Sequence, residues 1–276
     1  MQTKIRQLIR TISGIESSDG DGVKLTRVIG SHELPLLDPF LMLDAFRSDN
    51  ANDYIGGFPS HPHRGFEAVT YLLAGRLRHK DSEGHEGVIE PGGVQWMTAG
   101  SGIIHSEMPE QQNGLLHGFQ LWINLPAEDK FTPPRYQEFS SDDIILDESD
   151  NRTIRVIAGK TDQNIAGTVQ AEFVQPMLFD VSLSQGQAFR QAVSEFDNTF
   201  IYVIEGELAF TNPVGALQAN QLGIVVEGNV VEVMAKDDVR FLFASAQPLN
   251  EPIARGGPFV MTTQQQLQQA FRDYAR

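Results

Sequence analysis

The sequence predicts an all-β protein with two copies of one antiparallel fold, a sandwich or a barrel, and a short C-terminal helix. Three observations lead to this prediction. Short segments rich in Val, Ile, Leu, Phe and Tyr alternate with Gly, Pro, Asn and Asp from Val23 to Phe243, as in antiparallel sandwiches and barrels. One motif recurs 131 residues later, as YLLAGRL at 71–77 and YVIEGEL at 202–208. Helical periodicity is convincing only near the C-terminus.

The apolar segments are short and bounded by turn residues, so each is expected to form one strand. The clearest of these segments are 69–73, 119–124, 152–158, 200–204 and 239–244. The repeated motif is a strand that enters a Gly turn and a second strand, and two copies of one β-fold fit 276 residues. We therefore expect one copy of the fold in residues 1–140 and a second copy, with the helix, in residues 141–276. The acidic stretch 142–150 between the copies is expected to be a solvated loop.

The predicted helix carries one apolar stripe. Its apolar residues recur at the helical spacing i, i+3, i+4 and i+7, as Leu267, Ala270, Phe271 and Tyr274. Thr263 and Gln266 precede this stripe with the spacing of a capping box. We expect the stripe to pack on a barrel.

Composition excludes several classes of function. The 36 acidic and 21 basic side chains give a formal charge of −15, which disfavours direct contact with nucleic acids and anionic membranes. Cysteine is absent, which rules out disulfides, a thiolate nucleophile and Cys-ligated metals. No run of 18 apolar residues and no secretory signal occurs, so the sequence favours a cytoplasmic protein.

Histidine is confined to the N-terminal part of the chain, where all seven residues lie within the first 117. His61 and His63 are two residues apart, so in an extended strand both rings face the same side. Pro62 between them places this stretch at a strand entrance or sheet edge. The same spacing recurs at His105 and Glu107, and two such pairs on neighbouring strands would form a four-ligand metal pocket.

Three imidazoles and a carboxylate suit Fe(II), Mn(II), Ni(II), Cu(II) or Zn(II), and an octahedral ion would keep two positions open. Glu67 competes with Glu107 for the carboxylate role, but on an extended strand it lies too far from His63 unless the chain bends. We favour Glu107 as the ligand and Glu67 as a structural partner of Arg64 or Arg76. The other histidines have structural interpretations: His79 and His85 as exposed loop residues, His32 in a turn and His117 before a strand.

Three long motifs resemble the pirin family of the cupin superfamily. These are GFPSHPHRGFE at 57–67, PGGVQWMTAG at 91–100 and GIIHSE at 102–107. DPFL at 38–41 and GPFVM at 257–261 extend the resemblance over nearly the whole chain. The resemblance implies a bicupin with one Fe(II) in the N-terminal barrel, bound by His61, His63, His105 and Glu107.

The second barrel is expected to lack a metal site. The 131-residue offset projects His61 onto Ala192 and His63 onto Ser194, and neither residue is a useful ligand for the ion.

The resemblance also implies a function, because members of the family are similar to quercetin 2,3-dioxygenases. A flavonol oxygen would occupy an open metal position, Glu107 or Glu67 would take its proton as general base, and O2 would cleave the ring. Phe58, Trp96, Met97 and Phe119 lie near the ligands in sequence, so they are candidates for the pocket wall as well as for the core.

Two other functions fit parts of the sequence. Pirin-like proteins include transcriptional coregulators and modulators of metabolic enzymes, so a non-enzymatic, metal-dependent protein that binds a protein partner is the main alternative. An isomerase acting on a phosphosugar would need a cluster of cations, for which Arg64, Arg76, Arg78 and Lys80 are the nearby candidates.

Overall fold

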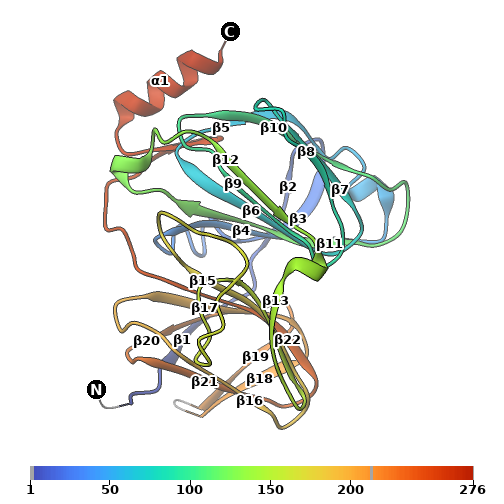
Figure 1. Ribbon diagram of the computed structural model, residues 1–276, viewed down its shortest axis with the longest axis vertical. Coiled ribbons are helices and arrows are strands. Elements are labelled where there is room, and N and C mark those ends of the chain that lie inside the picture. Colours follow the sequence, from blue (N-terminus) through green and yellow to red (C-terminus); the bar gives the residue numbers. More distant parts are fainter. Residues whose placement is uncertain (1–2, 212–213, 276) are drawn as a thin grey trace. The chain divides into compact units, whose positions relative to one another are not determined.

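A computed structural model describes residues 3–211 and 214–275, which form two compact units. The first unit consists of Ile15–Ser141 with Leu249–Arg276, and the second of Met1–Gly14 with Asp142–Pro248. Neighbouring strands pair in antiparallel fashion in both units (Figure 1). These observations confirm the predicted all-β class.

The first unit contains a seven-stranded sheet and a four-stranded sheet. The larger sheet has the order β12-β9-β6-β11-β4-β3-β2 and the smaller has the order β5-β10-β7-β8. The strands of the larger sheet are β2 (Ile15–Asp19), β3 (Val23–Ile29), β4 (Phe40–Ser48), β6 (Phe66–Ala74), β9 (Val94–Thr98), β11 (Leu116–Asn124) and β12 (Arg135–Phe139). The strands of the smaller sheet are β5 (Phe58–His63), β7 (Leu77–Asp81), β8 (Glu86–Ile89) and β10 (Ile103–Pro109). The short 3-10 helices are η1 (Ala51–Asp53), η2 (Ala127–Asp129) and η3 (Ser141–Asp143).

The second unit repeats this arrangement with the orders β1-β20-β17-β22-β15-β14-β13 and β16-β21-β18-β19. The strands of its larger sheet are β1 (Gln7–Ile12), β13 (Ile145–Ser149), β14 (Arg152–Ala158), β15 (Met177–Leu183), β17 (Asn198–Glu205), β20 (Leu222–Val226) and β22 (Val239–Ala246). The strands of its smaller sheet are β16 (Ala188–Ala192), β18 (Glu207–Thr211), β19 (Val214–Gln218) and β21 (Val230–Ala235). The five clearest predicted strands lie within β6, β11, β14, β17 and β22, as expected.

The sequence repeat corresponds to the same turn in both units. The first copy runs from β6 into β7 through Gly75, and the second runs from β17 into β18 through Gly206. Both glycines have positive φ, 88° and 79° respectively. An added Cβ would meet backbone oxygens at both positions, the carbonyl of Leu115 at 2.9 Å and that of Asp238 at 2.3 Å. Only glycine satisfies both requirements, which explains why it stands in both copies.

The predicted ranges 1–140 and 141–276 need one correction, because the terminal segments are exchanged. β1 pairs with β20 of the second unit, with Gln7 opposite Val226. It occupies the outer position that β12 fills in the first unit. Residues 249–276 belong to the first unit, where Arg64 forms a bridge with Phe259. Strand pairing between segments this far apart has no local sequence signature.

The C-terminal segment adds β23 (Ala254–Gly256), β24 (Phe259–Met261) and α1 (Gln264–Tyr274) to the first unit. Thr263 and Gln266 form the predicted capping box at the start of α1. Leu267 and Ala270 are buried against an apolar cluster that includes Phe259. The predicted helix and its packing are therefore confirmed. Among the described residues, no helix is both long enough and apolar enough to cross a membrane.

The acidic stretch is not a loop as expected, because most of it forms β13. This edge strand pairs with β14, with Asp147 opposite Ile154. Asp147 is buried and accepts a hydrogen bond from Arg152. The ion pair allows one carboxylate of an otherwise solvated run to lie inside the sheet.

The interiors of the two units differ in polarity. The second unit has one large apolar core in which Phe189 contacts Phe241 and Phe243. Smaller apolar clusters occur in the first unit, for example one that contains Phe66 and Trp122. Several of its strands bury polar side chains as well: Glu67, Thr70, His79, Gln95, Thr98, His105 and Glu107. Because buried polar groups are costly without partners, the first unit is where a functional site is expected.

Candidate metal centre

Two neighbouring strands bring the predicted histidines together. β5 and β10 pair in antiparallel register, with His61 opposite His105 and His63 opposite Ile103. β5 is an edge strand of its sheet, which is the predicted place for a strand containing Pro62. The register shifts between His105 and Glu107, so the two strands are not regular along their whole length.

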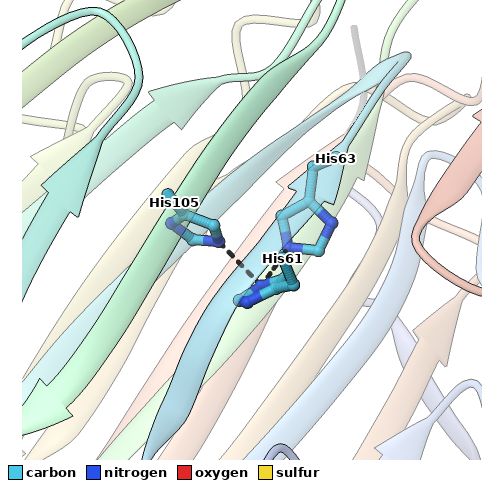
Figure 2. A group of neighbouring side chains, drawn as sticks. All are labelled: His61, His63 and His105. Carbon is cyan, nitrogen blue, oxygen red and sulfur yellow. Dashed lines mark hydrogen bonds between the residues drawn. The ribbon is translucent and has the colours of Figure 1, made fainter. Parts of the chain in front are cut away.

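The three imidazole rings point toward one another, as Figure 2 shows. Nε2 of His61 lies 2.9 Å from Nε2 of His63 and 3.0 Å from Nε2 of His105. One ring nitrogen from each residue lies within 4.8 Å of the others. His63 and His105 are buried, and His61 is partly buried.

Backbone carbonyls orient two of the rings. Nδ1 of His61 lies 2.8 Å from the carbonyl of Pro59, and Nδ1 of His63 lies 3.3 Å from the carbonyl of Pro258. A carbonyl oxygen can only accept, so Nδ1 carries the proton in both rings and Nε2 of the neutral ring presents a lone pair. Both lone pairs then face the centre of the group.

This donor set fits a divalent cation. Burial, together with the nearby His61, lowers the pKa of His63 to about 3, and burial lowers the pKa of His105 as well. Neutral imidazoles are the form that binds a metal. The Nε2 separations of 2.9 and 3.0 Å place the donor nitrogens of His63 and His105 close to that of His61. Imidazole nitrogens of this kind suit several divalent transition metals.

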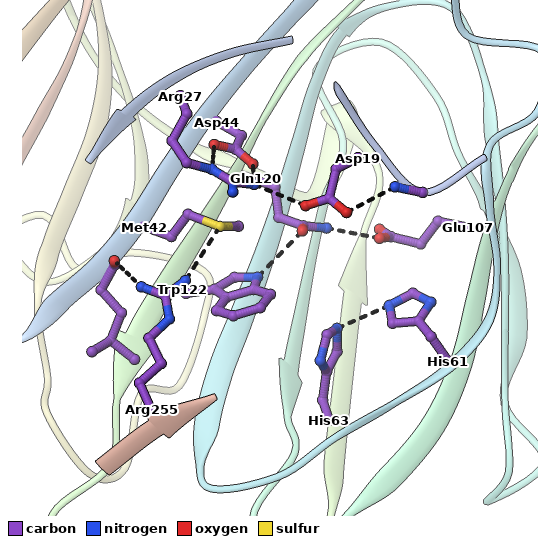
Figure 3. Close-up of polar contacts among 12 residues, drawn as sticks. Asp19, Arg27, Met42, Asp44, His61, His63, Glu107, Gln120, Trp122 and Arg255 are labelled. Atoms are coloured by element: carbon purple, nitrogen blue, oxygen red, sulfur yellow. Dashed lines mark hydrogen bonds and ion pairs between the residues drawn. The ribbon is translucent and has the colours of Figure 1, made fainter. Parts of the chain in front are cut away.

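Glu107 is placed beside the three histidines and not within their close group. Its carboxylate is buried and accepts two hydrogen bonds of 2.7 Å, from Oγ1 of Thr70 and from Nε2 of Gln120. Figure 3 shows Glu107 near His61, with Gln120 reaching its carboxylate. An ionised carboxylate has further lone pairs on both oxygens, so these hydrogen bonds do not prevent coordination.

Glu67 lies on β6 and is also buried. It accepts a hydrogen bond from Oγ1 of Thr98. The expected pairing with Arg64 or Arg76 is not formed, because Arg64 pairs with Asp273 and Arg76 with Glu90.

The prediction for His79 is wrong, those for His85 and His32 are confirmed, and that for His117 holds in part because the residue lies on the strand and not before it. His79 lies on β7 and is fully buried, with its ring 5.3 Å from that of His105. His85 is half-exposed and bonds to Asp81. His32 is exposed, and His117 is buried on β11. The repeat predicted a strand after Gly75, but the buried face of that strand holds Leu77, His79 and Asp81. With a single apolar residue on this face, the burial of His79 could not be recognised from the sequence.

A cavity of about 600 Å³ opens beside the histidines. Its lining residues all come from the first unit: Asp19, Gly20, Arg27, Met42, Phe58, Pro59, His61, His63, Gln120, Trp122, Arg255, Gly257 and Pro258. A space of this size is typical of sites that bind a small molecule. The close group of histidines thus has an accessible side, which a purely structural metal site would not need.

Only one of the four suspected wall residues lines the cavity. Phe58 does, whereas Trp96, Met97 and Phe119 are buried in the core. Sequence reasoning missed Gln120 and Trp122, which alternate along β11 and therefore point to the same face. A polar residue in a strongly apolar strand was the signal that could have identified this face.

The cations considered for a phosphosugar site are already neutralised. Arg78 pairs with Glu86 and Glu110, and Lys80 lies near Glu86. Neither lines the cavity, so these cations supply no phosphate site there.

The corresponding strand of the second unit has no such donors. Ala192, onto which His61 projects, lies on β16 opposite Val230. Within the described ranges 3–211 and 214–275, the three histidines are the only close group of metal-binding side chains.

Comparisons with known proteins agree with this architecture. The Pirin family model matches residues 22–123, and the model of the pirin C-terminal cupin domain matches residues 178–276. A pirin-like protein of Caulobacter vibrioides is 48% identical, over 99% of this chain and 98% of its own length. A Pseudomonas aeruginosa protein, provisionally named a quercetin 2,3-dioxygenase, is 43% identical over 99% of this chain and 97% of its own. The crystal structure of quercetin 2,3-dioxygenase from Acinetobacter baumannii aligns with a TM-score of 0.88 at 34% identity, covering 99% of this chain and 98% of that one. The chain therefore belongs to the pirin family and is a bicupin.

Proposed function

We propose that this chain is an Fe(II)-dependent dioxygenase that cleaves a flavonol such as quercetin. The observation that supports this most strongly is the convergence of three imidazole Nε2 atoms at an accessible cavity. Similarity to proteins named as quercetin 2,3-dioxygenases supports the choice of reaction. Mn(II), Ni(II), Cu(II) or Zn(II) could be held by the same donors.

The residues that would hold the ion are His61, His63, His105 and Glu107. When bound, the ion would supply Lewis acidity to a phenolic oxygen and positions for that oxygen and for O2. The carbonyls of Pro59 and Pro258 keep the donor nitrogens of His61 and His63 aimed inward.

Glu107 is the proposed general base. Thr70 and Gln120 hold its carboxylate in one orientation, and an oriented carboxylate within hydrogen-bond reach can take the proton of a substrate hydroxyl. Gln120 is itself oriented, because its Oε1 accepts a hydrogen bond from the Trp122 indole at 3.2 Å. The chain from Trp122 through Gln120 to Glu107 thus links the cavity wall to the base.

The cavity suits a planar aromatic substrate. Trp122 and Phe58 line it and offer apolar ring faces. Its volume of about 600 Å³ exceeds what a single aromatic ring needs, so a molecule of several fused or linked rings fits the space.

The test is anaerobic loading with Fe(II), followed by air and quercetin, with loss of the quercetin absorbance as the readout. Metal content is measured in parallel. The His61→Ala variant is expected to lose iron and activity together. His32→Ala removes an exposed histidine of the same unit and is expected to retain both.

Two results would contradict the proposal. Retention of iron by His61→Ala would place the metal elsewhere. Intact quercetin and intact related phenols in an iron-loaded wild-type protein would exclude the dioxygenase reaction, and a metal-dependent regulatory protein would then be the better hypothesis.

A further inference from the structure

Arg255 is a cation in the cavity wall, and none of the carboxylates in the described part of the chain forms a salt bridge with it. It lies on β23 and is exposed to solvent. Its Nη1 donates to the carbonyl of Leu41 at 3.0 Å, and its Nη2 has only the sulfur of Met42, at 3.9 Å. Sulfur is a weak acceptor, so the guanidinium retains N–H groups that can bind a further acceptor in the cavity.

The other charges near Arg255 are already paired with one another. They are Arg27, Asp44 and Asp19. Arg27 forms a bidentate ion pair with Asp44, with N–O distances of 2.9 and 2.7 Å. It also donates a hydrogen bond of 2.8 Å to Asp19. Both carboxylates are therefore directed at Arg27, and neither forms a salt bridge with Arg255.

Trp122 separates Arg255 from the histidines, as Figure 3 shows. The guanidinium carbon lies 5.2 Å from the indole centre, and the indole centre lies 5.0 Å from that of His63. A planar molecule lying along the indole would have one end near Arg255 and the other near the proposed metal site.

The chemistry of this position favours an oxyanion. A guanidinium presents a planar set of donors that matches the two oxygens of a carboxylate and also binds a phenolate. The net charge of −15 repels an anionic ligand at long range. A local cation is therefore needed for such a ligand to be bound well.

We propose that Arg255 determines substrate specificity by binding an oxyanion on the end of an aromatic substrate that lies away from the metal. This inference rests on the proposed function for the placement of the other end. The oxyanion is a carboxylate or an ionised phenol, two groups that share the chemistry of a charged oxygen on a ring.

The test uses three ligands: 3-hydroxyflavone, its 4′-carboxylate derivative and its 7-hydroxy derivative. Dissociation constants are measured from quenching of tryptophan fluorescence in the Fe(II)-loaded protein without O2, so no turnover is required. The wild type is expected to bind the carboxylate derivative about tenfold or more tightly than 3-hydroxyflavone, because a charge-assisted hydrogen bond is gained. If an ionised phenol is the group bound, the 7-hydroxy derivative gains a similar advantage at pH 8.5 but not at pH 6.5.

Arg255→Gln is expected to abolish the preference for the anionic ligand, and Arg255→Lys to keep part of it. Arg76→Gln removes the same charge outside the cavity and is the matched control, which should keep the full preference. Circular dichroism establishes that each variant is folded.

The outcomes separate the two proposals. If the wild type binds all three ligands without preferring either oxyanion, Arg255 does not bind one and this inference is overturned, while the proposed function stands. An equal preference in the wild type and in Arg255→Gln overturns it in the same way. Failure of the wild type to bind any of the three overturns the proposed function as well.

Discussion

Lys130 provides a quantitative test of how the first unit is held together. Its ammonium group is buried and donates to the carbonyl of Gly65 at 2.6 Å, to the carbonyl of Val260 at 2.9 Å and to the side chain of Asn124. These acceptors lie on the turn after β5, on β24 and at the end of β11. One side chain thus joins three segments, including the one that follows His63.

Burial lowers the pKa of Lys130 from 10.5 to about 7. The folded protein then releases a proton above pH 7 that the unfolded chain keeps up to about pH 10.5. Stability therefore rises with pH through this range, by up to about 1.4 kcal/mol per pH unit. Between pH 7 and pH 9 the accumulated difference is about 2 kcal/mol.

The experiment compares wild type with Lys130→Met in urea at several pH values. Both tryptophans, Trp96 and Trp122, lie in the first unit, so tryptophan fluorescence reports the unfolding of that unit. Between pH 7 and pH 9 the free energy of unfolding of the wild type is expected to rise by about 2 kcal/mol more than that of Lys130→Met. Lys24→Met removes an exposed lysine of the same unit and is the control. The difference in free energy of unfolding between wild type and Lys24→Met should be the same at pH 7 and at pH 9.

A stability difference that is constant from pH 7 to pH 9 would refute this reasoning. It would show that the three oxygen acceptors keep the ammonium charged in the folded state, because a neutral amine has only two N–H groups to offer them.

Three further predictions concern other buried contacts. Arg6→Met removes the donor of five hydrogen bonds, three of them buried, including the bond to Oγ1 of Thr199. It should lower the free energy of unfolding by about 3 kcal/mol or more in calorimetry, and an unchanged transition would contradict this. Gly65→Ala should lower the melting temperature and the iron content together, because φ is +87° and a Cβ would lie 2.0 Å from the carbonyl oxygen of Val260. A variant with the melting temperature and iron content of the wild type would show that alanine causes no strain at this position. Gln120→Leu removes a donor to Glu107 and should weaken metal binding about tenfold in a chelator competition, and unaltered affinity would mean that Glu107 is not a ligand.

The sequence was sufficient to predict local features of the fold. The strands were predicted from short apolar runs. The turns at Gly75 and Gly206 have backbone conformations that favour glycine, and the capping box needs only two side chains three residues apart. Each depends on residues close in sequence. The pairing of β1 with β20 depends on contacts across the whole chain, and no local pattern encodes it.

In the candidate site, too, only the features that depend on residues close in sequence could be predicted. His61 and His63 belong to one strand, and the matching spacing at His105 and Glu107 indicated a second. The cavity wall was not predictable, because Arg255 comes from β23, far along the chain from β5. The burial of His79 was missed for a related reason, since it follows from neighbouring strands and from Tyr136, whose ring stacks on it.

The exchanged terminal segments set an order for events during synthesis, which proceeds from the N-terminus. β1 is translated before β20 and has no partner until that strand has been made. The arrangement of His63 waits as well, because the carbonyl that orients its ring belongs to Pro258, 195 residues further along the chain. The three histidines therefore reach their final arrangement only after Pro258 has been made. Metal capture by a nascent chain that has not yet reached Pro258 is accordingly expected to be weak.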